Sequence, residues 1–310
     1  MNLSSSERKT IFDRIFMILF LLVALLAASS IVFIIVFILI EGIKPFVNTY
    51  PAVSGRLQKA DFGIFITSTL WTDLNYGALG ALVNTIYLTA IATVVALPIS
   101  VLSALFIVRI APKWLGIILQ NIVELLAAIP SIIFGIFGSG VICPLVRDFA
   151  ELFGIQTAGG NSGLSTIIVL IMMMIPTITM LSVTSMKAVR KPLIEASLAL
   201  GASKTQTDFR IVLAGAKSGI MAALILGVGR ALGEATAVSL VCGNVVQGPN
   251  WDLFDLSRTL TSTMMLGLHE ASGIAYDIRF SVGILLIVTI LVVNVILNIV
   301  KKRITRYERA

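Results

Sequence analysis

Glu195-Ala196-Ser197-Leu198-Ala199-Leu200-Gly201, followed ten residues after its glycine by Ile211-Val212-Leu213, is a short and partly polar stretch between two long apolar runs. Pro192 suits the first turn of a helix, where its missing N–H has no partner to lose. The closing glycine suits the left-handed position that ends a helix. Ser203 and Gln206 have the spacing of a capping box at the start of a second helix. The stretch therefore predicts two short helices, which form either an amphipathic surface pair or a docking site for a partner protein.

The composition places this stretch in a membrane protein. Hydrophobic residues make up 57% of the chain and charged residues 13%, which is about half the charged fraction of an average soluble domain. Six apolar runs are long enough to cross a bilayer as helices, which takes about 20 residues each. They cover residues 15–40, 74–108, 115–142, 163–186, 219–246 and 280–300. Because the runs do not alternate as barrel strands do, we predict an all-α membrane protein with six transmembrane helices.

The distribution of Lys and Arg predicts the orientation of these helices. With the N-terminus inside, the inner segments carry 16 of the 23 basic residues and the outer segments carry six. Lys and Arg accumulate in cytoplasmic loops, so both termini and the stretch around Glu195 are predicted to be cytoplasmic. The same bias accounts for the net charge of +7. No soluble segment interleaves basic and aromatic residues, so this charge does not indicate nucleic-acid binding.

The remaining basic residue, Arg230, lies inside the fifth apolar run, in Gly229-Arg230-Ala231-Leu232-Gly233-Glu234. On a continuous helix Arg230 and Glu234 share one face, so we expect them to pair. The two glycines have the G-x-x-x-G spacing at which helices approach closely. Charges at membrane depth usually face a bundle interior or a water-filled cavity, and a guanidinium presents a planar fork of donors to an oxyanion. Arg230 therefore either lines an anion path or belongs to a structural ion pair.

Prolines predict interruptions in three of the helices. Pro98, Pro130 and Pro176 lie within the second, third and fourth apolar runs. A proline inside a helix lacks the N–H that would bond the preceding turn, and it permits a kink. Kinked helices around a polar interior suit a transporter that changes access, although static bundles also contain prolines.

Patterns for catalysis and for cofactors are missing from the sequence. No G-x-x-x-x-G-K-[ST] segment occurs, so the chain has no visible means of binding ATP. His269 is the single histidine, and a lone loop histidine lacks the partners of a metal or catalytic site. Cys143 and Cys242 fall near outer helix ends, either as small apolar residues or as a disulfide. We predict a protein that is not an enzyme and that has no cofactor and no metal.

At the stretch around Glu195 the chain resembles the permease subunits of bacterial ABC importers. Their cytoplasmic loop carries Glu-Ala-Ala, a glycine a few residues later and then Ile-x-Leu-Pro. Here Ser197 replaces the second alanine and Ala214 replaces the proline. Residues 124–135, 229–238 and 241–244 also resemble the phosphate importer permease of the PstC type. The Gly-Arg-Ala-Leu-Gly-Glu segment points to phosphate, and its continuation favours the PstC type over the sister PstA type.

The resemblance implies a fold and a division of the chain. The implied fold is the MetI-like fold of ABC importer permeases, with six transmembrane helices and a cytoplasmic coupling-helix loop. The implied division is a cytoplasmic N-terminus over residues 1–14, a first transmembrane helix with a long periplasmic loop over 15–76, the permease domain over 77–303 and a cytoplasmic tail over 304–310.

The resemblance also implies partners and site residues. The protein partners are a homologous permease of the PstA type, a dimer of ATP-binding subunits and a periplasmic or extracellular phosphate-binding protein. The lipid of the bacterial cytoplasmic (inner) membrane surrounds the chain itself. The residues of the substrate path carry over to Arg230 and Glu234. Those that dock the ATPase carry over to Glu195, Ala196 and Gly201.

The predicted function is that of a permease subunit in an ATP-driven importer of inorganic phosphate. Another oxyanion, molybdate or sulfate, is the alternative substrate. An ion-driven secondary transporter is a second alternative, but it needs no docking site for an ATPase. A membrane-embedded assembly or signalling subunit is a third, but it needs no Arg and Glu inside the membrane.

The predicted orientation can be tested by labelling. Single cysteines placed in the loop of Arg190 and in the loop of Asp255 are treated on intact cells with a thiol reagent that does not cross the membrane. We expect labelling in the Asp255 loop alone, because the basic residues place the Arg190 loop inside. Labelling in the Arg190 loop but not in the Asp255 loop would reverse the predicted orientation.

Overall fold

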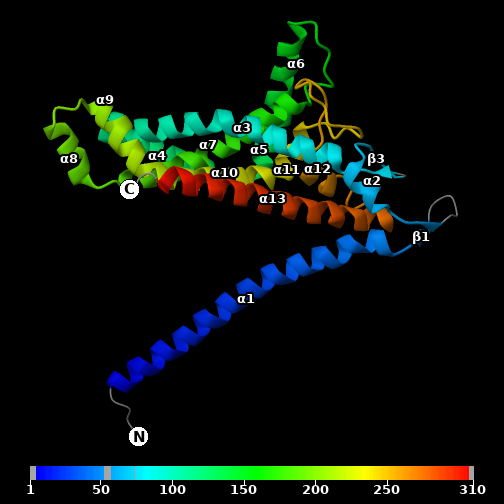
Figure 1. The fold of residues 1–310 in the computed structure, drawn as a ribbon, viewed down its shortest axis with the longest axis horizontal. Helices are drawn as coiled ribbons and strands as arrows, with labels where there is room; N and C mark the ends of the chain where they lie inside the picture. The colour runs from blue at the N-terminus through cyan, green and yellow to red at the C-terminus, as the bar shows by residue number, and fades with distance from the viewer. Residues whose placement is uncertain (1–4, 52–56, 74, 307–310) are drawn as a thin grey trace.

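The computed structural model describes residues 5–51, 57–73 and 75–306 and is almost entirely helical (Figure 1). Within these residues, six helical segments are long and apolar enough to cross a membrane, which confirms the predicted number. They are Phe12–Val47, Leu79–Ile110, Ser131–Glu151, Gly163–Lys187, Lys204–Leu232 and Ile274–Ile304.

Three helices form the centre of the bundle: α3 (Leu79–Leu105), α7 (Gly163–Lys187) and α10 (Leu213–Leu232). Inside a membrane the hydrophobic effect contributes little to the association of helices. Close packing at small residues stabilises their contacts instead. A Cβ built on Gly227 of α10 would lie 2.8 Å from Ile178 Cγ1 of α7. The shared core of the three helices contains Leu88, Ala92, Ala96, Leu170, Met174, Ile178, Ala223, Leu224 and Val228.

The long helix α13 (Ile274–Arg306) packs against α10 and carries the C-terminal part of α1 (Ser5–Val47). Ser281 Oγ donates to Gly42 O at 2.6 Å, and the rings of Phe37 and Phe280 meet edge to face. The N-terminal part of α1 diverges from the bundle (Figure 1), and its apolar side chains from Phe12 onward are exposed. In a bilayer this part of α1 faces lipid or another protein.

The two ends of the bundle differ (Figure 1). The end that holds α8 (Lys191–Ala199) and α9 (Lys204–Thr207) is called the α8 end below. The opposite end, the loop end, holds the short helix α2 (Phe62–Thr67) and two antiparallel hairpins. The hairpin strands are β1 (Tyr50–Pro51) with β2 (Leu57–Gln58), and β3 (Trp71–Thr72) with β4 (Asn75–Tyr76).

The interruption predicted at Pro130 is confirmed, but the prediction of one membrane-spanning helix over residues 115–142 is wrong. α4 (Lys113–Ala128) ends before Pro130, and α5 (Ser131–Phe137) begins after it. Ile129 has φ −64° and ψ 129°, the extended conformation that a following proline favours. The π-helical η2 (Gly138–Ile142) then leads into α6 (Cys143–Glu151), which projects from the bundle in Figure 1. The apolar segment long enough to span is therefore Ser131–Glu151.

The prediction of a single fifth helix over residues 219–246 is also wrong. This helix starts earlier, because α9 and the π-helical η3 (Asp208–Val212) continue directly into α10. α10 ends at Leu232, and a new helix, α11 (Thr236–Val241), begins after three intervening residues. The chain then crosses an irregular segment to α12 (Leu260–Met265) before entering α13.

The local expectations for prolines and cysteines had different outcomes. Pro130 alone ends a helix, whereas α3 continues through Pro98 and α7 through Pro176. Both of these helices already lie in the tightly packed centre, which holds them in line. Cys143 and Cys242 are buried free thiols. Of the two alternatives, the structure therefore supports small apolar residues and not a disulfide.

Candidate functional site

The three residues between α10 and α11, Gly233-Glu234-Ala235, are held in place by a buried carboxylate. Glu234 is 8% exposed, and its Oε1 accepts hydrogen bonds from Ala237 N at 3.0 Å and from Thr236 Oγ1 at 2.9 Å. The carboxylate thus supplies an acceptor to the first turn of α11, as the side chain of an N-cap residue does. Inside a membrane no water is present to do so. Thr261 Oγ1 of α12 donates to the Glu234 carbonyl at 2.7 Å and fixes the interruption from a second side.

The interruptions at Pro130 and at Glu234 lie against each other. Ser131 Oγ at the start of α5 is 2.8 Å from Thr236 Oγ1 at the start of α11. A Cβ built on Gly135 would lie 2.7 Å from Ala237 Cα, so the two short helices touch almost backbone to backbone. Ser131 and Thr236 are 105 positions apart in the chain, so two distant breaks form one polar region.

Arg230 lies in the last turn of α10 and does not pair with Glu234. Its Nη1 donates to Thr177 Oγ1 of α7 at 2.8 Å. Among the residues that the structure describes, Arg230 forms no ion pair. The predicted pairing is wrong because α10 ends at Leu232, so that Glu234 no longer follows Arg230 by one helical turn and instead turns toward α11.

The surroundings of Arg230 suit it to hold an anion. A guanidinium has five donors, and here a single neutral hydroxyl accepts from it. No carboxylate in the described part of the chain neutralises its charge, and oxyanions match its planar fork. Thr177 was missed in the sequence, since a threonine inside an apolar run carries no distinguishing signal. Only the packing of α7 on α10 brings its hydroxyl to Arg230.

The G-x-x-x-G spacing does not mark a contact within the described chain. A Cβ built on Gly229 would meet no heavy atom within 4 Å, and Gly233 is exposed. The expected close approach is instead made by small residues elsewhere on α10 and on α11: Ala223, Gly227 and Ala237, all of them buried. Gly233 and Ala237 no longer continue the face of α10, because this helix ends at Leu232.

The stretch around Glu195 forms the predicted pair of short helices. α8 has Pro192 in its first turn, and Gly201 takes the left-handed conformation at φ 85°. At the start of α9 the capping box is complete, because Ser203 Oγ accepts from Gln206 N at 3.2 Å and Gln206 Oε1 accepts from Ser203 N at 3.0 Å. These local predictions are confirmed.

The α8 end presents apolar side chains that the chain leaves uncovered. Leu200 is 90% exposed, and Glu195, Ala196 and Gly201 are exposed on the same segment. Leu200 and Ala196 line a cavity of about 390 Å³ that is completed by Arg210 and its neighbours. Exposed apolar groups around a concavity favour an interaction surface over a plain amphipathic helix pair.

A partly buried ion pair ties this segment to the bundle. Arg109 Nε, in the π-helical η1 (Phe106–Ile110) at the end of α3, lies 2.6 Å from Asp208 Oδ1 at the start of η3. Ser197 Oγ and Thr207 Oγ1, 2.9 Å apart, join α8 to α9. Short polar contacts therefore link α8 and α9 to both α3 and α10, and the charge-assisted contact is the stronger kind.

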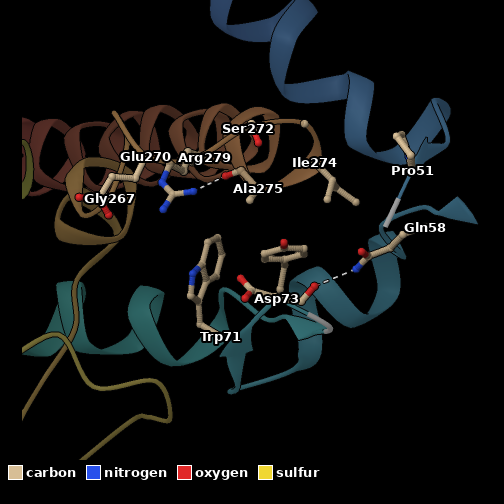
Figure 2. Close-up of a pocket in the computed structure, with 13 residues that line it drawn as sticks. Pro51, Gln58, Trp71, Asp73, Gly267, Glu270, Ser272, Ile274, Ala275 and Arg279 are labelled. Carbon is tan, nitrogen blue, oxygen red and sulfur yellow. Dashed lines mark hydrogen bonds between the residues drawn. The ribbon is translucent and has the colours of Figure 1, made fainter. Parts of the chain in front are cut away.

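A second cavity, of about 690 Å³, opens at the loop end (Figure 2). Asp73, Glu270 and Arg279 contribute its charged groups. Arg279 is already engaged by the backbone, since its Nε and Nη2 donate to Leu266 O and its Nη1 donates to Ala275 O. This guanidinium closes the turn between α12 and α13, in contrast to that of Arg230.

Residues 96–307 match the family described as "Binding-protein-dependent transport system inner membrane component". The chain belongs to this family. The matched residues include the stretch around Glu195, Arg230 and both helix interruptions. Together with the six apolar segments, the family makes the chain a multi-pass protein of the inner membrane and a transport component that is not itself an enzyme.

Individual relatives agree with this assignment. The chain is 35% identical over 230 residues to the probable ABC transporter permease protein YqgH of Bacillus subtilis, which covers 72% of each chain. It is 32% identical to the phosphate transport system permease protein PstC of Pasteurella multocida, over 80% of this chain and 82% of that one. A bacterial ABC transporter that imports the polysaccharide alginate has a chain with TM-score 0.63 and 21% identity, over 92% of this chain and 96% of that one. This last likeness confirms the predicted importer permease fold.

The role of Glu234 as a cap can be separated from a role as a counter-ion. Glu234→Gln keeps an acceptor oxygen for Ala237 N, so we expect the abundance and thermal stability of the purified protein to stay near those of the wild type. Glu234→Ala removes the acceptor and is expected to destabilise the protein by about 1–3 kcal/mol, the usual effect of leaving a buried donor unpaired.

The matched control is Glu151→Ala, which removes a carboxylate whose side chain is 65% exposed at the end of α6. It is expected to leave thermal stability unchanged. If Glu234→Gln proved as destabilising as Glu234→Ala, the charge of Glu234 and not its capping oxygen would be the stabilising feature.

Proposed function

We propose that this chain is the permease subunit of an ATP-driven importer that carries inorganic phosphate across the bacterial inner membrane. The observation that carries the proposal is the guanidinium of Arg230, which lies beside an interior helix break with a single neutral hydroxyl as its partner. A positive group of this kind in a region of low dielectric attracts an anion strongly. The PstC-type relatives, at about one third identity over most of the chain, support phosphate as that anion.

In this proposal Arg230 and Glu234 have different roles. Arg230 contacts the phosphate oxygens with its planar fork. Glu234 shapes the path by holding the start of α11, and it keeps its own negative charge turned toward neutral donors. The α8 end lies in the cytoplasm, as the 16 inner basic residues favour, and the loop end faces outward.

The proposed partners follow from the two ends of the bundle. A dimer of ATP-binding subunits docks on the α8 end through Glu195, Ala196 and Gly201, beside the exposed Leu200. A phosphate-binding protein delivers its ligand at the loop end. A homologous permease of the PstA type completes the path, which is supported by the uncovered faces of Gly229 and Gly233 next to Arg230.

Molybdate or sulfate remains the alternative substrate, because a guanidinium fork recognises tetrahedral oxyanions in general. An ion-driven secondary transporter is disfavoured by the built surface at the α8 end. A structural subunit without a path is disfavoured by the charge of Arg230, which no carboxylate among the described residues neutralises, since a charge at membrane depth is costly for a protein that has no use for it.

Docking is tested by Leu200→Asp, measured as co-purification of the ATP-binding subunit with the permease. A leucine side chain buried on docking contributes about 1.5–3 kcal/mol, so we expect binding to weaken about 10- to 100-fold, with normal insertion in the membrane. Gly201→Asn probes the same surface without backbone strain, because asparagine tolerates positive φ and a Cβ there would meet open space.

The control for docking is Leu152→Asp, which changes a leucine that is 80% exposed just after α6. It is expected to leave co-purification unchanged. Full recovery of the ATP-binding subunit with Leu200→Asp would place the docking surface elsewhere on the chain.

The substrate is tested by uptake of labelled phosphate in cells whose own copy of this chain is replaced by variants. We expect Arg230→Gln to reduce uptake about 10- to 100-fold, the effect of losing one charged hydrogen bond or two, and Arg230→Lys to reduce it less, since the charge remains. Lys59→Gln, a charge removed from an exposed site at the loop end, is the control and should transport normally. Uptake of molybdate or sulfate in place of phosphate by the wild type would reassign the substrate.

A further inference from the structure

Arg258 is a buried cation that the function described so far does not use. It lies in the segment between α11 and α12, where the sequence suggests an outer loop, yet it is only 8% exposed. Its Nη2 donates to Asn244 O at 2.8 Å. Its Nε is buried and finds no acceptor in the described chain.

The charge of Arg258 has no counter-ion among the described residues, because none of the ion pairs found there includes it. Burial lowers the pKa of its guanidinium, while Cys242 raises it and the positive charge of Arg279 lowers it further. A guanidinium nevertheless stays protonated in proteins. A buried cation without a carboxylate partner is destabilising, unless an anion occupies the site for part of the time.

The position of Arg258 relates it to the break at Glu234. Ser257 N donates to Cys242 O at 2.7 Å, which sets Arg258 against the C-terminal end of α11. Thr261, three residues later, donates to the Glu234 carbonyl beyond the opposite end of α11. α11 has six residues and so measures about 9 Å at 1.5 Å per residue. The two unneutralised arginines, Arg230 and Arg258, therefore belong to opposite ends of one short helix.

A neutral donor without a partner lies in the same layer. Asn84 of α3 is fully buried, and neither its Nδ2 nor its Oδ1 has a hydrogen-bond partner. The neighbouring Thr85 Oγ1 accepts from Leu260 N at 2.9 Å, two residues beyond Arg258. A Cβ built on Gly248 would lie 3.3 Å from Asn84 Nδ2. Asn84 thus faces the segment that carries Arg258, and unsatisfied buried amides are rare enough to ask for a ligand or water.

We propose that Arg258 is a second oxyanion contact on the transport path, on the loop-end side of Arg230. Phosphate that enters from the loop end meets Arg258 first and passes along α11 to Arg230. Two contacts in series allow each to hold the anion weakly enough to release it, as multi-site conduction requires. This inference rests on the proposed function, and it adds a residue that the sequence places in an outer loop.

The test uses the complete transporter in proteoliposomes, with the binding protein, both permeases and the ATPase. Labelled phosphate imported per ATP hydrolysed is compared between the wild type and Arg258→Met, which keeps much of the side-chain volume without the charge. We expect this ratio to fall about 10- to 100-fold, corresponding to the loss of one or two charged hydrogen bonds. Arg258→Lys, which keeps the charge but not the fork, should lose less. Because the ratio is taken on assembled transporters, it does not depend on their abundance.

The matched control is Arg279→Met, since Arg279 is also a partly buried arginine but donates to backbone carbonyls of its own turn (Figure 2). Its ratio should equal that of the wild type. An unchanged ratio in Arg258→Met would overturn the inference, and so would an equal fall in Arg279→Met. If Arg258→Met does not assemble, a wild-type ratio in Arg258→Lys overturns the inference and a lowered one supports it. A wild-type transporter that hydrolyses ATP without importing phosphate would contradict the proposed function itself.

Discussion

Every backbone polar group at membrane depth needs a partner from the protein, because the lipid supplies none. This constraint explains why the interruption between α10 and α11 is built around a buried carboxylate. Glu234 does not serve as the counter-ion of Arg230, and its Oε1 instead accepts a hydrogen bond from the first turn of α11. The same demand places Thr261 on the Glu234 carbonyl and Ser131 beside Thr236. The polar interior of this protein thus follows from two broken helices and the groups that satisfy their ends.

This arrangement leaves the guanidinium of Arg230 without a carboxylate partner among the described residues. If Arg230 paired with Glu234 on a continuous helix, the carboxylate would neutralise the guanidinium. Such a pair would attract a passing anion only weakly. With the carboxylate turned to α11, the guanidinium retains its charge and most of its donors, and Thr177 merely orients it. The same helix break therefore shapes the backbone and exposes the charge.

The α8 end shows a different relation between sequence and role. Its helices are short and are defined by local signals at their ends, so they form without long-range contacts. What connects this surface to the interior is a long-range contact, the pair of Arg109 and Asp208, which are 99 positions apart. This pair and the direct continuation of η3 into α10 join the α8 end to the helix that carries Arg230. The α8 end and the interior break are thus joined by one continuous helical segment, formed by α9, η3 and α10.

The sequence by itself determined the membrane class, the number of spanning helices and the pair of short helices around Glu195. These depend on composition, on run length and on caps within a few residues, all of which are local. It also indicated Arg230 as unusual, because a charge in an apolar run is visible in one dimension. The break of the third helix at Pro130 was also predictable, because proline is a local signal. Only the tertiary structure decided that α3 and α7 continue through their prolines, where the fifth helix breaks, that Glu234 serves α11 and not Arg230, and that Arg258 is buried. Those outcomes depend on which groups from distant helices meet, since a hydroxyl of Thr177 or Thr261 acquires a role only from the partner that packing brings to it.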